Sequence, residues 1–122
     1  MSVRVSMRQA LSAAMRARDK VAVSALRAAL AALDNAEAVP PDATAPAAGA
    51  LEAAPFGAGA TEVARRELTE HDVQEILRAE VTERLAFARQ LTAPSHAERA
   101  DRLRAEAGVL LRFLDGDRQA PA

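Results

Sequence analysis

Apolar residues recur at spacings of three and four along four segments of this chain, and this period constrains the fold more than any other feature. The first segment shows it with Val3, Met7, Leu11 and Met15, which lie on one stripe of an amphipathic helix. Only 2% of the 122 residues are aromatic, and most of the other apolar residues are alanine, which favours helices over strands. We therefore expect an all-α protein.

Capping residues indicate where the helices begin and end. Thr69 and Asp72 have the spacing of a capping box, and so have Ser95 and Glu98. Gly116 follows the last apolar stripe and is expected to end the fourth helix. The expected helices cover residues from about 2–17, 19–38, 70–91 and 96–115.

The short links within each pair of helices predict how the helices are arranged. Asp19 is the expected N-cap of the second helix, and it leaves so few linking residues that the first two helices must run antiparallel. A segment from about 39–61 is rich in proline, alanine and glycine, which indicates a long flexible connector. We expect a single domain in which two antiparallel helical hairpins, joined by this connector, form a small four-helix bundle.

Composition argues against several classes of function. The chain contains no cysteine, which removes disulfides, thiolate nucleophiles and thiolate metal ligands. No apolar run approaches the roughly 20 residues that cross a bilayer, so we expect a cytoplasmic protein without a membrane partner. His71 and His96 fall in the first turns of the third and fourth helices, where we expect them to be solvated, and we assign them no catalytic, cofactor or metal role.

One arginine falls close to an apolar stripe. Arg27 lies between Val23 and Leu30 in angular position on the second helix, and Glu80 faces the same core from the third. Because a buried charge needs a partner, we predict that Arg27 pairs with Glu80. An active site is the alternative, but without a nucleophile or metal ligand an internal clamp is favoured. The predicted buried network comprises Arg27, Glu80, Arg84 and Glu106.

Basic residues gather near the N-terminus, although the net charge of the chain is −1. Residues 1–38 contain six basic and three acidic side chains. Arg16, Arg18 and Lys20 occupy the expected first turn, where they could bind RNA phosphates. A solvated helix end is the alternative, since recognition of single strands usually adds aromatic side chains and the three phenylalanines are scattered.

Several short motifs occur in an order that resembles one known family, GatB/YqeY. Its opening hairpin is similar to Ala14-Met15-Arg16-Ala17-Arg18-Asp19-Lys20, Leu26-Arg27 and Asn35-Ala36-Glu37. Its third and fourth helices are similar to Leu68-Thr69-Glu70, Glu80-Val81 with Arg84, and Glu106 followed by Val109-Leu110 and Phe113-Leu114. The resemblance covers nearly all of residues 2–114 apart from the connector.

The family includes stand-alone bacterial proteins similar to the tail region of the tRNA-dependent amidotransferase B subunit. The resemblance implies a YqeY-like, non-catalytic helical binding module without a cofactor, accessory to tRNA or to a tRNA-dependent amidotransferase. Family proteins are often classed as carbon–nitrogen ligases with glutamine as amido-N-donor, but this chain shows no residues for that chemistry. The chain departs from the family in its long connector, and we expect the family's second small helical domain to be missing. A helical protein-interaction or oligomerisation module with no RNA role is the alternative.

Overall fold

The structure is a computed structural model that describes residues 2–38 and 66–119 of the chain. Within these ranges the chain forms four α-helices and a short 3-10 helix, and no strand occurs in them. The elements are α1 (Val3–Ala17), α2 (Lys20–Ala38), α5 (Glu70–Gln90), η1 (Pro94–His96) and α6 (Ala97–Gln119). The all-α prediction is confirmed, whereas the connector expected at about 39–61 lies outside the described residues.

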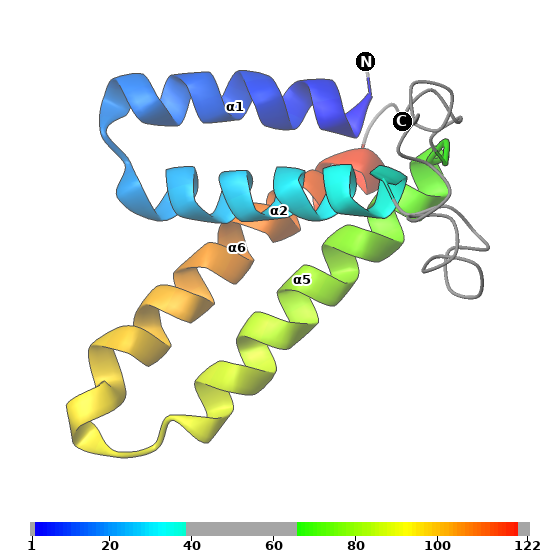
Figure 1. Ribbon diagram of the computed structural model, residues 1–122. Coiled ribbons are helices and arrows are strands. Elements are labelled where there is room, and N and C mark those ends of the chain that lie inside the picture. The colour runs from blue at the N-terminus through cyan, green and yellow to red at the C-terminus, as the bar shows by residue number, and fades with distance from the viewer. Residues whose placement is uncertain (1, 39–65, 120–122) are drawn as a thin grey trace, which may run out of the picture.

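The helices form two pairs that meet at an angle. α2 returns alongside α1 after a tight turn, and α6 returns alongside α5 after η1 (Figure 1). The α5–α6 pair crosses the α1–α2 pair obliquely, and the end of the α5–α6 pair that holds η1 projects beyond it (Figure 1). Among the helices of the described ranges, none combines the length with the apolar character that crossing a membrane would require.

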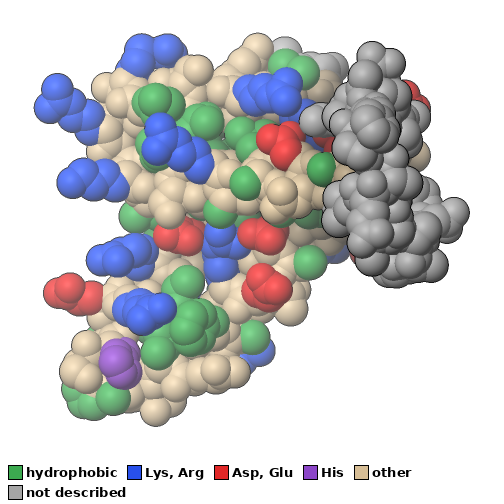
Figure 2. Space-filling view, in the orientation of Figure 1, with side chains coloured by type: hydrophobic (Ala, Val, Ile, Leu, Met, Phe, Trp, Pro, Cys, Tyr) green, Lys and Arg blue, Asp and Glu red, His purple; other side chains and the backbone are tan. Residues whose placement is uncertain are grey.

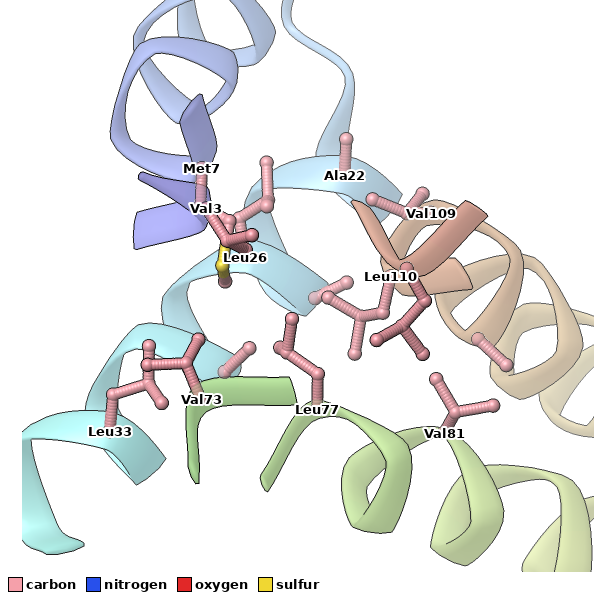
Figure 3. Close-up of a cluster of buried hydrophobic side chains, with 14 of the residues drawn as sticks. Val3, Met7, Ala22, Leu26, Leu33, Val73, Leu77, Val81, Val109 and Leu110 are labelled. Carbon is pink, nitrogen blue, oxygen red and sulfur yellow. The ribbon is translucent and has the colours of Figure 1, made fainter. Parts of the chain in front are cut away.

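The hydrophobic core lies where the two pairs meet, and every helix contributes to it (Figure 3). The largest fully buried side chains are Met7 from α1, Leu26 and Leu33 from α2, Leu77 from α5 and Leu110 from α6. Burying a side chain of this size stabilises the fold by roughly 1.5–3 kcal/mol. Small side chains complete the core and let the helices approach closely, namely Ala14, Ala22, Ala25, Ala29 and Ala107.

The projecting end of the α5–α6 pair is held differently. Ala88 of α5 and Ala100 of α6 are buried there, with 1% and 3% of their surface exposed, but neither belongs to the core cluster. The large aromatic side chain nearby, Phe87, is 40% exposed, and the guanidinium of Arg99 lies 5.2 Å from its ring centroid. This end therefore depends on contacts between α5 and α6 alone.

The start of α5 agrees with the sequence prediction. The Thr69 hydroxyl accepts a hydrogen bond from the Asp72 N–H, and the Asp72 carboxylate accepts one from the Thr69 N–H, both at 3.0 Å. Leu68 and Val73 flank this capping box, and both pack in the core. The hydrogen bond from the Thr69 backbone N–H favours the ionised carboxylate, so the pKa of Asp72 is lowered from its usual 3.8.

α6 begins within one residue of the predicted start, but its cap and its C-terminal end differ from the prediction. Ser95 lies inside η1, so it is not the cap of a box with Glu98; α6 follows η1 directly. The reason is Pro94, whose ring fixes φ in the helical region and brings the chain into a helical turn at once. α6 also continues past Gly116, because a glycine ends a helix only when it adopts the left-handed conformation.

The apolar stripe of α1 turns away from the core along its length. Val3 and Met7 are buried and Leu11 is half-buried, but Met15 is 49% exposed. Each step of four residues rotates the stripe about 40° beyond a full turn, which adds up to about 120° at Met15. Ala14 takes its place in the core. The expectation that Met15 belongs to the buried stripe is therefore wrong.

Candidate functional site

The turn between α1 and α2 has an unusual backbone conformation. Arg18 has φ 59° and ψ 36°, the left-handed region that glycine usually occupies. Its N–H donates to the Met15 carbonyl at 3.2 Å, and the N–H of Asp19 donates to the Ala14 carbonyl at 2.9 Å. The Asp19 carboxylate then accepts from the Ala22 N–H at 3.1 Å and caps α2, as predicted.

An open groove of about 760 Å³ lies beside this turn, between the C-terminal end of α1 and the first half of α2. Its charged lining comes from Arg18, Lys20 and Arg27, and its apolar lining from Met15, Val23 and Ala28. We call this surface the basic groove. Figure 2 shows hydrophobic side chains between the two helices with basic side chains around them.

The positive charges of the basic groove are not neutralised within it. The lining contains no acidic side chain, and within the described residues no ion pair joins Arg18, Lys20 or Arg27 to a carboxylate. The Arg27 guanidinium instead lies with Nη2 4.0 Å from the Met15 sulfur. The groove therefore presents cations and apolar atoms together to solvent.

The position of Arg27 corrects the predicted network. Arg27 is exposed, and it does not contact Glu80. At 100° per residue, Arg27 lies about 140° around the helix from the centre of the buried face of α2, which is formed by Ala22, Ala25, Leu26, Ala29 and Leu33. Arg27 belongs to the basic groove, and the predicted clamp from α2 to α5 does not exist.

The other three members of the predicted network come together. Arg84 Nε donates to Glu106 at 3.0 Å, and Arg84 Nη1 donates to Glu80 at 2.8 Å. Only 12% of the Arg84 side chain and 11% of the Glu106 side chain are exposed. Burial lowers the pKa of Arg84, but its hydrogen bonds to the two carboxylates outweigh burial, so its pKa is raised. This network joins α5 to α6 and stabilises the fold.

A second ion pair was not among the sequence predictions. Arg4 Nη1 lies 2.9 Å from a carboxylate oxygen of Glu37, and both side chains are mostly buried. The pair joins the start of α1 to the end of α2. Because the two helices are antiparallel and linked by a tight turn, their register brings these positions together. The antiparallel register of α1 and α2 was therefore the feature of the sequence from which this ion pair could have been predicted.

The structure places only two of the three predicted RNA-binding residues in the basic groove. Arg16, Arg18 and Lys20 are all exposed, but only Arg18 and Lys20 line the basic groove. His71 and His96 are also exposed.

A comparison of the chain with protein-family models, curated proteins and solved structures finds no significant match.

Proposed function

We propose that the chain is a non-catalytic helical binding module of the GatB/YqeY type and that the basic groove is its contact surface. The proposal includes a cytoplasmic location and a bundle of two antiparallel hairpins joined by the connector at about 39–61. The motif resemblance supports the family. One observation carries the binding function, which is that Arg18, Lys20 and Arg27 make no ion pair within the described residues and lie beside the exposed side chain of Met15.

The resemblance makes tRNA, alone or with a tRNA-dependent amidotransferase, the first partner to test. Cations that bind phosphates release counterions, so the affinity for tRNA should fall steeply as salt rises. Changing Arg16, Arg18 and Lys20 together to alanine should flatten that dependence. No binding at low salt would reject tRNA as a partner.

A matched control separates these contacts from general charge. Arg78 and Arg104 are also exposed, but they pair with Glu75 at 2.6 Å and Asp101 at 3.0 Å. Replacing both by alanine removes two cations outside the basic groove. If this variant loses as much salt dependence per cation removed as the triple variant, the groove is not the contact surface.

A protein partner without any RNA role is the second candidate, and the apolar lining favours it. Met15 is 49% exposed, and Val23 and Ala28 continue the apolar surface beside it. Phosphate contacts would leave these side chains unused. Capture from a native lysate by the wild type and by the triple variant, followed by analysis of both RNA and protein, distinguishes the two candidates.

A further inference from the structure

The basic groove is open to solvent and long enough to lie against a helix. Its lining comes from Met15 of α1, from the turn residue Arg18 and from five residues of α2. From Lys20 to Ala28 it extends about 12 Å along α2, or slightly more than two helical turns. A third helix lying along the groove would bring apolar side chains at spacings of three and four onto it.

The apolar lining suits side chains of a partner protein. Met15 is the most exposed of the large hydrophobic side chains in the described residues. A methionine thioether is flexible and adapts to different apolar partners. Val23 is half-buried beside it, so a leucine or phenylalanine from a partner would cover both. A sugar–phosphate chain would not bury this surface.

The charges of the basic groove indicate that its partner carries negative charge. Arg18, Lys20 and Arg27 surround the apolar lining, and each lacks a carboxylate partner within the described part of the chain. Carboxylates on both edges of a partner helix would meet these cations. Ion pairs at the edge of an interface contribute mainly to specificity and to the rate of association.

The left-handed backbone conformation of Arg18 is a second, independent observation that favours the basic groove as a binding surface. An arginine in the left-handed region costs roughly 1–2 kcal/mol, and a glycine would form the same turn without that cost. Backbone strain of this kind is concentrated at functional sites. Here the side chain of the strained residue lines the basic groove.

We infer that the basic groove binds an acidic amphipathic helix of a partner protein. Apolar side chains of that helix cover Met15 and Val23, and its carboxylates meet Arg18, Lys20 and Arg27. The inference rests on the proposed function in one respect, because it takes the basic groove as the contact surface.

Two designed peptides test the inference against the full-length chain by fluorescence anisotropy. Both are 18-residue helices with leucines at spacings of three and four; one carries glutamates beside the leucines and the other carries lysines. The glutamate peptide should bind and the lysine peptide should not. Met15→Asp should weaken binding of the glutamate peptide about tenfold or more, as loss of a central anchor does. Changing Arg18, Lys20 and Arg27 together to glutamate should reverse the preference between the peptides.

Val5→Asp is the matched control for Met15→Asp, because Val5 is a 40% exposed apolar residue on the same helix, outside the groove. It should leave peptide binding unchanged. Equal binding of both peptides, binding of neither, or equal effects of the two aspartate variants would overturn the inference. If the peptides do not bind but tRNA binding depends on Arg18 and Lys20, the inference of a partner helix is wrong, whereas the proposal that the basic groove is the contact surface is supported. If peptide, tRNA and lysate capture are all insensitive to groove variants, the proposed function fails as well.

Discussion

Replacing Arg84 by methionine should destabilise the protein more than any change in the basic groove. Arg84 makes charged hydrogen bonds of 3.0 Å to Glu106 and 2.8 Å to Glu80. Methionine keeps much of the volume but leaves the Glu106 carboxylate, 11% exposed, without its partner. Removing one partner of a buried ion pair costs about 3–5 kcal/mol. Because the Glu80 side chain is 21% exposed and regains some water, we expect about 3 kcal/mol, at the lower end.

Urea and thermal unfolding followed by circular dichroism measure this effect. In a small domain, 1 kcal/mol shifts Tm by roughly 4–8 °C, so Arg84→Met should lower Tm by more than about 10 °C. Arg27→Met is the matched control, and its effect should stay within about 0.5 kcal/mol because Arg27 is exposed. Adding Glu106→Gln to Arg84→Met should restore part of the loss, since it removes the stranded charge. Equal stabilities of the two methionine variants would refute the argument.

Three further changes have definite expected results. Arg18→Gly should raise the free energy of unfolding in urea by roughly 0.5–1 kcal/mol, since relief of the left-handed strain exceeds the added chain entropy; a decrease would contradict the strain argument. Thr69→Ala should lower it by about 1 kcal/mol through loss of the N-cap, again measured in urea. The lowered pKa of Asp72 adds stability that is present above pH 3.8 and is lost as pH falls through the folded-state pKa. Asp72→Asn should therefore reduce the dependence of Tm on pH below 3.8, and an unchanged profile would exclude this contribution.

The parts of the fold that depend on local chemistry could be predicted from the sequence. The helical period gave the helix class, and the spacing of Thr69 and Asp72 was enough to locate a capping box because both hydrogen bonds lie within one turn. The cap at the start of α6 could not be predicted from residue spacing alone. Ser95 and Glu98 have the same spacing, but Pro94 fixes the backbone before a cap can form.

The basic groove could not be predicted from the sequence. Alanine occurs on both buried and exposed faces of a helix, so it does not indicate which face of α2 is buried. Val23 and Leu30 are two of the larger apolar residues of α2, and their spacing predicted that Arg27 lies near the core. The structure buries Ala25 and Ala29 completely and leaves Val23 and Leu30 at the edge. The left-handed conformation of Arg18 has no sequence signal either, since that position usually holds glycine.

The projecting end of the α5–α6 pair gives the molecule two levels of cooperativity. Ala88 and Ala100 are buried between α5 and α6 but are separate from the core cluster, so opening this end exposes little apolar surface. Backbone amides there can exchange their protons through local opening, while those around Leu26 and Leu77 exchange only when the whole domain unfolds. We therefore expect the far end of the α5–α6 pair to exchange its amide protons faster than the core that supports α1 and α2.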